Sequence, residues 1–150
     1  MADGERVCVV AGASAWPFYL ATGAWVGQEN RRFGDATRLG FYSGRQIQAV
    51  LPRIRHVVAS VPLTPEDAAT RALSADPLDR RVGEALAAAL HDGGTVARVA
   101  VVLLSRPDDD DTVTVEPVTH DGDAAWTLFQ RFTDVDRLRR ATTTDDLRDE

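Results

Sequence analysis

Strand-forming segments fall into two groups separated by a pair of helices, and this order limits the folds open to the chain. A doubly wound parallel sheet needs strands and helices in regular alternation, which is absent here. The order predicts an α+β fold with a curved, mostly antiparallel sheet and two or three packed helices. The segments with strand character are residues 5–11, 38–43, 45–51, 53–61, 95–104 and 112–118.

Residues 38–43 and 45–51 predict a hairpin that turns at Ser43 and Gly44. Glycine accepts a positive φ without steric cost, so the Ser-Gly pair suits a tight turn. Pro52 then marks a break or an edge. In the following strand, alternation places Ile54, His56 and Val58 on one face and Arg55, Val57 and Ala59 on the other.

Two helix starts are written into the middle of the chain. Thr64-Pro65 and Asp76-Pro77 each place an N-cap side chain before a proline at the first helical turn. Gly93 and Gly94 are typical of a helix end. The apolar face of the second helix is predicted to comprise Leu78, Val82, Ala85, Leu86, Ala89 and Leu90.

The last third predicts a central strand, a polar loop, a second strand and a helix. Residues 95–104 are apolar at nearly every position, and residues 112–118 alternate with Val113 and Val115 inward. A helix near 123–132 is expected to bury Trp126, Phe129 and Phe132. Residues 134–150 are expected to form a polar, frayed tail.

Length and composition predict a single domain spanning residues 1–150. The charged opening is unlike a signal peptide, and the longest apolar run, residues 99–104, is too short to span a bilayer. One cysteine, Cys8, excludes an internal disulfide. We therefore expect a cytoplasmic protein that does not bind membranes.

Positive charge is concentrated in one segment of an acidic chain. The net charge is −6, whereas residues 31–55 hold six arginines and one acid, which gives 6 − 1 = +5 there and −6 − 5 = −11 elsewhere. All 17 basic residues are arginine, as in proteins of GC-rich, bacterial-type genomes. Guanidinium groups pair with phosphate in a planar fork. A whole-surface nucleic-acid coat is disfavoured, and a local contact is not.

Aromatic rings overlap this arginine-rich segment, since seven of the ten lie in the first 42 residues. Rings beside guanidinium groups hold unstacked bases and their phosphates. The alternatives are that the rings fill the core and that the arginines coat a solvated edge strand. The predicted nucleotide or nucleic-acid site comprises Trp16, Trp25, Tyr42, Arg38, Arg45, Arg53 and Ser14.

The stretch Leu39-Gly40-Phe41-Tyr42, a short turn, and then Ile47-Gln48-Ala49-Val50 and Ile54 resembles part of the PUA-like superfamily, in particular the EVE and YTH-type barrels. The likeness is limited to about residues 5–55. It implies a small antiparallel barrel that holds a modified or extruded base between aromatic walls. Trp16, Trp25 and Tyr42 would then be the walls, and Ser14 and Arg45 the polar contacts. The lysine signature of the related ASCH domains is absent, because the chain has no lysine.

Catalytic patterns are weak. Ser14 follows a strand but lacks the second glycine of a nucleophile elbow, and Cys8 in mid-strand is typical of inert packing. His120 and Asp121 offer acid–base groups, although a turn explains them equally well. The run Asp108–Asp111 lacks the spacing of a calcium loop. No cofactor and no metal are indicated.

The sequence therefore favours a non-catalytic module that recognises a nucleotide, a modified base or a single-stranded nucleic-acid segment. An alternative is an accessory or immunity-type subunit that binds a protein partner through the same rings and arginines. A second alternative is an enzyme that uses His120 and Asp121.

Overall fold

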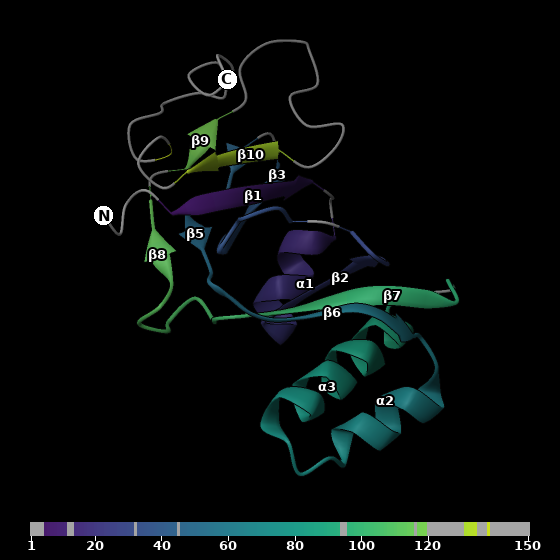
Figure 1. Ribbon diagram of the computed structural model, residues 1–150. Coiled ribbons are helices and arrows are strands. Elements are labelled where there is room, and N and C mark those ends of the chain that lie inside the picture. Colours follow the sequence, from purple (N-terminus) through teal and green to yellow (C-terminus); the bar gives the residue numbers. More distant parts are fainter. Residues whose placement is uncertain are drawn as a thin grey trace. The chain divides into compact units, whose positions relative to one another are not determined.

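The chain forms two compact units in the computed structural model (Figure 1). Unit 1 collects residues 1–17, 33–53 and 105–150, and unit 2 collects residues 18–32 and 54–104. Each unit is described by itself. The structure describes residues 5–11, 14–31, 33–44, 46–93, 96–115, 117–119, 131–134 and 138.

Unit 1 is built on β-sheets in which one strand pair is parallel. Its larger sheet has the order β10-β1-β3-β4-β9, and a two-stranded sheet pairs β5 with β8. Only β1 and β3 run parallel in these described sheets. The strands are β1 (Arg6–Ala11), β3 (Arg38–Ser43), β4 (Gln46–Ile47), β5 (Val50–Leu51), β8 (Val113–Thr114), β9 (Val118–Thr119) and β10 (Arg131–Asp134).

The β3–β4 hairpin confirms the predicted turn. Ser43 pairs with Gln46, and Gly44 has a φ of 62°. The expected strand over 45–51 is interrupted, however, and appears as β4 and β5. Beyond β4, the Gln48 backbone N–H still donates to the Phe41 carbonyl at 2.8 Å, and its side-chain amide donates to the Ser43 carbonyl at 2.9 Å.

The core of unit 1 lies on one face of β1 and β3. Val7 and Val9 point to this face, and a Cβ on Gly40 would lie 3.3–3.4 Å from both valines and Leu51. The absence of a side chain at Gly40 therefore lets its neighbours fill that space. The buried cluster consists of Val7, Val9, Ile47, Leu51, Val115 and Leu138, with Tyr42 and Val113 packed against it.

Unit 2 is a three-stranded antiparallel sheet with two helices on one face (Figure 1). The apolar segment predicted as a central strand is indeed central, because β7 lies between β2 and β6. Ile54, His56 and Val58 are half-buried while Arg55, Val57 and Ala59 are exposed, as expected from alternation. The elements are β2 (Ala24–Gln28), β6 (Ile54–Pro62), α2 (Pro65–Ala72), α3 (Pro77–His91) and β7 (Arg98–Leu104).

Both helix starts are confirmed. The Thr64 hydroxyl accepts from the Asp67 backbone N–H at 3.1 Å, and the Asp76 carboxylate accepts from the Leu78 N–H at 3.0 Å. Each bond satisfies an N–H that the helix itself leaves unpaired. The predicted apolar face of α3 is wrong at one residue, because Leu78 is 37% exposed. The apolar residues shared by the helices and the sheet are Ala24, Val61, Leu63, Ala68, Val82, Ala85, Leu86, Val99, Val101 and Leu103.

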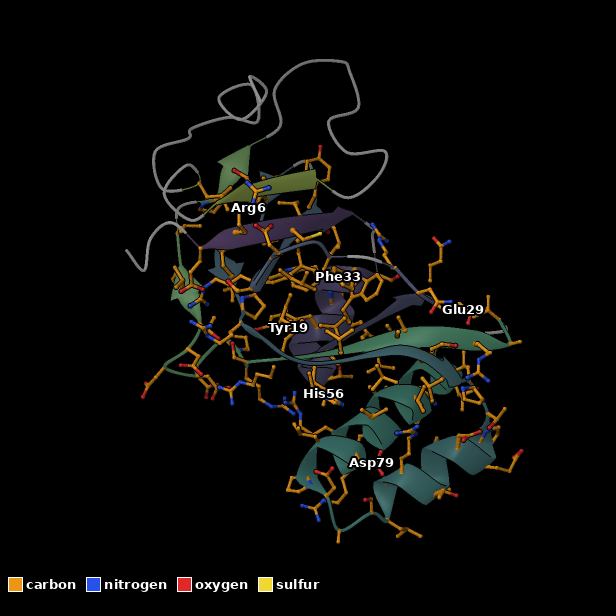
Figure 2. The ribbon with its side chains drawn as sticks, viewed as in Figure 1. Arg6, Tyr19, Glu29, Phe33, His56 and Asp79 are labelled. Atoms are coloured by element: carbon orange, nitrogen blue, oxygen red, sulfur yellow. The ribbon has the colours of Figure 1, made fainter. Side chains whose placement is uncertain are left out.

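Close contact between α2 and α3 depends on Gly83. A Cβ at this position would lie 2.4 Å from the Ala72 backbone nitrogen and 2.7 Å from the Ala68 carbonyl oxygen. An ion pair between Arg71 and Asp79 (Figure 2) joins the same two helices. The helices thus meet backbone to backbone, and side chains at the margin fix their alignment.

Residues 14–27 contain α1 (Ala15–Thr22) and most of β2. Pro17 is tolerated because it lies in the first turn of α1, where the backbone N–H has no helical partner. Gly23, with a φ of 72°, separates the helix from the strand. It ends the helix in the manner expected of a left-handed residue, and its N–H donates to the Tyr19 carbonyl at 2.7 Å.

The end of the chain corrects one prediction. A helix was expected over 123–132, but residues 131 and 132 belong to β10, where Phe132 pairs with Cys8 of β1. Pairing with a strand far away in sequence decides these residues, and no local pattern reveals it. Residues 123–130, with Trp126 and Phe129, lie outside the described residues. The predicted strand 112–118 appears as β8 and β9, with Val113 half-buried and Val115 buried.

The predicted α+β class is confirmed, because the described residues form three helices and mostly antiparallel sheets. That the chain acts as a single domain stays a prediction. Within the described part of the chain, no helix has the length and apolar character needed to cross a bilayer.

We expect Gly83→Ala to destabilise the protein by about 1–3 kcal/mol, because the new methyl group would force α2 and α3 apart. In an uncrowded helix the same change would stabilise by up to about 1 kcal/mol. Urea unfolding followed by circular dichroism measures the difference. Glu84→Ala, on the exposed side of α3, is the matched control and should change stability by less than about 0.5 kcal/mol. A Gly83→Ala protein as stable as the wild type would contradict the close contact.

Candidate nucleic-acid interface

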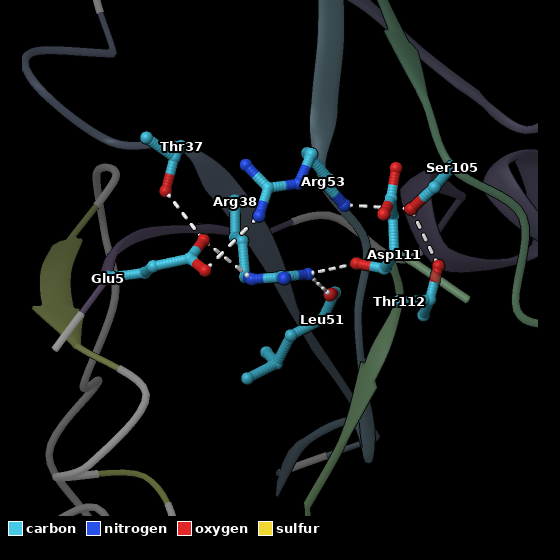
Figure 3. A network of polar contacts seen from close by, with 8 residues as sticks. All are labelled: Glu5, Thr37, Arg38, Leu51, Arg53, Ser105, Asp111 and Thr112. Carbon is cyan, nitrogen blue, oxygen red and sulfur yellow. Dashed lines mark hydrogen bonds and ion pairs between the residues drawn. The ribbon is translucent and has the colours of Figure 1, made fainter. Parts of the chain in front are cut away.

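Arg38 was predicted to contact phosphate, but the structure buries it within unit 1. Only 4% of its side chain is exposed, and its Nε–H donates to the Glu5 carboxylate at 3.0 Å (Figure 3). Its Nη1 donates to the carbonyl oxygens of Leu51 and Asp111. A buried charge requires such partners, because leaving it unpaired costs several kcal/mol (about 3–5). Arg38 therefore has a structural role in this unit.

Arg53 lies beside Arg38 and is more accessible. Its Nη2 donates to the second oxygen of Glu5 at 3.2 Å, and 38% of its side chain is exposed. Its backbone N–H donates to the buried Ser105 hydroxyl at 2.8 Å, which in turn lies 2.6 Å from the Thr112 hydroxyl (Figure 3). The network thus reaches from β1 to the loop that precedes β8.

Glu5 receives three donors, because the Thr37 hydroxyl also donates to its carboxylate at 3.0 Å. Partial burial by itself would raise the pKa of Glu5. The Thr37 hydrogen bond and the charges of Arg38 and Arg53 outweigh this effect and lower the pKa. The carboxylate is therefore held ionised between two guanidinium groups.

Trp16 and Tyr42, predicted as two walls of one pocket, lie on opposite faces of β3. Gly40 shares the core face with Val7 and Val9, so Tyr42, two residues further on, points the same way and packs on that core. Phe41 points to the other face, where its ring lies 5.6 Å from that of Trp16 at a tilt of 50°. The Trp16 ring is partly exposed, and Ser14, just before α1, is exposed.

Trp25, the third predicted wall, belongs to unit 2 and is only 4% exposed. A Cβ on Gly27 would lie 2.4 Å from the indole, so the ring runs along its own strand over the space that glycine leaves. The Arg31 guanidinium lies 5.4 Å from the ring centroid, within cation–π range. The Trp25 ring is thus covered on its own unit and is not an open stacking platform.

The structure brings together Arg38 and Arg53, and it places Trp16 and Tyr42 on opposite faces of β3. Arg45 and the pair His120 and Asp121 lie outside the described residues. The sequence does not identify the two other residues that contact these arginines. Glu5 falls within the predicted strand 5–11, and no pattern marks Thr37. The available signal was the excess of cations in residues 31–55, which requires a carboxylate from elsewhere in the chain. Among the described residues, no group of three metal-ligating side chains gathers.

Lowering the pH should weaken the Glu5 cluster. Because the pKa of Glu5 is lower in the folded protein than in the unfolded chain, its contribution to stability is complete above the ordinary value of 4.5 and is lost as the pH falls through the folded-state pKa. Glu5→Gln lacks this contribution. We expect the variant to be less stable than the wild type at pH 7, and the difference in unfolding free energy to shrink as the pH approaches about 3.

Urea unfolding at a series of pH values measures this difference. Asp35→Asn is the control, because Asp35 forms a 3.4 Å pair with Arg6 while its side chain is 79% exposed. Such surface pairs contribute at most about 1 kcal/mol. A constant difference between wild type and Glu5→Gln across the pH range would contradict the assigned role of Glu5.

No protein-family model matches the chain, and no curated protein matches it. Among solved structures, two mutants of ZmASCH from Zymomonas mobilis are similar. The tyrosine-to-phenylalanine mutant matches over 75% of each chain with 8% identity and a TM-score of 0.44. The serine-to-alanine mutant matches over 79% of this chain and 77% of its own, with 10% identity and a TM-score of 0.42.

Proposed function

We propose that the chain is a non-catalytic module that binds a nucleotide or a single-stranded nucleic-acid segment, with the Trp16 indole as the ring on which a base stacks. One observation carries this proposal. Trp16 is partly exposed while its ring is supported by the buried Phe41, so it is accessible and also held in place. Stacking on such a ring contributes about 1–3 kcal/mol per base.

Other polar groups of unit 1 suit the same ligand. Ser14 is exposed two residues before Trp16 and offers a hydroxyl. Arg53 exposes 38% of its side chain, and Arg45 of the β3–β4 turn is proposed to contact the phosphate backbone. The resemblance of residues 39–54 to PUA-like domains favours a single extruded or modified base over a long strand.

The acidic remainder of the chain is compatible with such binding. The net charge of −6 includes a segment, residues 31–55, that carries +5. A local positive segment attracts phosphate over about 8–10 Å at physiological salt, whereas the rest of the surface repels it. Binding should therefore be confined to a short site and weaken steeply as salt increases.

Two exposed leucines favour a second candidate function, binding to a protein partner. Leu73 is 87% exposed and Leu78 is 37% exposed at the turn between α2 and α3 of unit 2. Side chains of this kind gain most by burial against another protein. This candidate places the interface on unit 2, away from Trp16 in sequence.

Trp16→Ala should weaken binding of short single-stranded oligonucleotides by about fivefold to a hundredfold, the equivalent of one lost stacking contact. Fluorescence anisotropy of labelled DNA and RNA oligomers at low salt measures the affinity. Trp25→Phe is the matched control, because it also removes an indole but from a covered position. Its affinity should stay within about twofold of the wild type, since removing no ligand contact changes little.

Two results would count against the proposal. One is wild-type protein that binds no oligonucleotide or nucleotide at low salt, and the other is equal affinity of Trp16→Ala and wild type. If oligonucleotides do not bind but a protein partner is retained by the wild type and lost by Leu73→Ser, the second candidate function is correct.

A further inference from the structure

We infer that Thr37, Arg38 and Arg53 form a binding site for a phosphate dianion or phosphate monoester, and that the carboxylate of Glu5 occupies this site in the ligand-free protein. The three residues are called the phosphate clamp below. The inference concerns a contact to phosphate, so it is independent of whether a base stacks on Trp16.

The donors of the clamp converge on one anionic group. Thr37 Oγ1 and Arg38 Nε lie 3.0 Å from Glu5 Oε2, and Arg53 Nη2 lies 3.2 Å from Oε1 (Figure 3). Two guanidinium groups and a hydroxyl around one oxyanion are the donor types that hold phosphate, because guanidinium groups form charge-assisted hydrogen bonds to the oxygens of both carboxylate and phosphate. The donors that hold the Glu5 carboxylate are therefore of the kind that phosphate requires.

Arg38 and the backbone of Arg53 are fixed by contacts that do not involve Glu5. Arg38 Nη1 is held by the Leu51 carbonyl at 2.9 Å and by the Asp111 carbonyl. The backbones of Arg38 and Arg53 form an antiparallel bridge, and the Arg53 N–H is held by Ser105. Removing the Glu5 carboxylate should therefore leave Arg38 and the two backbones where they are, and a preformed site binds without the cost of ordering.

Charge also favours a dianion. The clamp brings two guanidinium groups to one carboxylate, so Glu5 balances one of the two positive charges. In the loop before β8, Asp111 contacts Arg38 through its backbone carbonyl. A phosphate with two negative charges would balance both guanidinium groups and offer more acceptor oxygens than a carboxylate.

Solvent reaches the clamp from the side of Glu5. Thr37 is exposed, 38% of the Arg53 side chain is exposed, and 20% of the Glu5 side chain is exposed. Arg38 forms the buried floor. A phosphate entering from solvent would therefore meet Arg53 and Thr37 before Arg38, and it would compete with the Glu5 side chain for their donors.

Competition by Glu5 sets the expected size of the effect. The apparent affinity for phosphate is reduced by the fraction of molecules in which the clamp is open. If the clamp is open in about one molecule in ten, removing the carboxylate should tighten phosphate binding by about tenfold.

The test is a thermal-shift and calorimetric titration of the full chain with inorganic phosphate at pH 7.5, at an ionic strength held constant with chloride. Glu5→Ala should melt at a lower temperature than the wild type in chloride, because Arg38 loses its charged partner. Phosphate should restore the melting temperature saturably. Its dissociation constant should be about tenfold lower for Glu5→Ala than for the wild type. Glu5→Gln, which keeps the side-chain length without the charge, is measured in parallel in case Glu5→Ala does not fold.

A double variant supplies the control. Glu5→Ala combined with Arg53→Gln keeps the buried floor but loses one arm of the clamp, and phosphate should no longer stabilise it beyond the chloride control. Equal stabilisation of the double variant, or no saturable effect of phosphate on either Glu5→Ala or Glu5→Gln, would overturn the inference.

Comparison of thymidine 5′-monophosphate with thymidine separates the sources of the phosphate. If the protein binds thymidine 5′-monophosphate at least as tightly as inorganic phosphate and does not bind thymidine, the clamp holds the phosphate of a nucleotide. If it binds inorganic phosphate but not the monophosphate, the clamp holds the free ion. Both results support the clamp. If phosphate binds to Glu5→Ala while Trp16→Ala leaves oligonucleotide affinity unchanged, the clamp stands and the stacking proposal falls.

Discussion

The burial of Arg38 is the constraint on which unit 1 depends. A guanidinium that is 4% exposed must be matched by acceptors, and these come from the residue before β1 (Glu5), from β5 (Leu51) and from the loop before β8 (Asp111). The three segments are separated by 33, 13 and 73 residues from Arg38. A single side chain therefore ties together parts of the chain that share no local signal. Loss of any one acceptor would leave a buried charge only partly satisfied, which is more costly than the loss of a surface pair.

Local chemistry explains what the sequence predicted well, and long-range partners explain what it missed. The caps at Thr64 and Asp76, the turn at Gly44 and the alternation of β6 involve residues within a few positions of one another, so their patterns are legible in the chain. By contrast, β10 is a strand because it pairs with β1, more than a hundred residues away. The site shows the same division. The arginine-rich segment and its rings were recognised, and alternation within the strand already places Tyr42 and Phe41 on opposite faces. Which of the two faces the core, however, depends on the register of β3 against β1, where Gly40 lies beside Val7 and Val9. The acid that fills the arginine cluster could not be chosen among 23 acidic residues without that register either.

The two predicted indoles of the described chain show why exposure matters more than residue type. Trp25 lies over Gly27 with the Arg31 guanidinium near its ring, so its aromatic surface is already used within unit 2. Trp16 lies against Phe41 and remains partly exposed. Composition alone makes the two residues equivalent, since each is a tryptophan beside a turn. The difference arises from a glycine two residues after Trp25, which lets the ring lie down along its own strand.

The structure also changes the meaning of the arginine excess. An arginine-rich segment in an acidic chain was expected to face a ligand phosphate, yet two of its members face a carboxylate of the same chain. These are not opposed roles, because a cluster that holds a carboxylate through two guanidinium groups and a hydroxyl has the donors that phosphate requires. What separates a purely structural ion pair from an occupied binding site is whether the donors keep their places when the carboxylate leaves. Arg38 is anchored by two carbonyl oxygens and Arg53 by its backbone bridge and Ser105, so the floor of the site is determined by the fold and not by Glu5. The affinity of that floor for an external anion then depends on how strongly Glu5 competes, which is a property of one side chain.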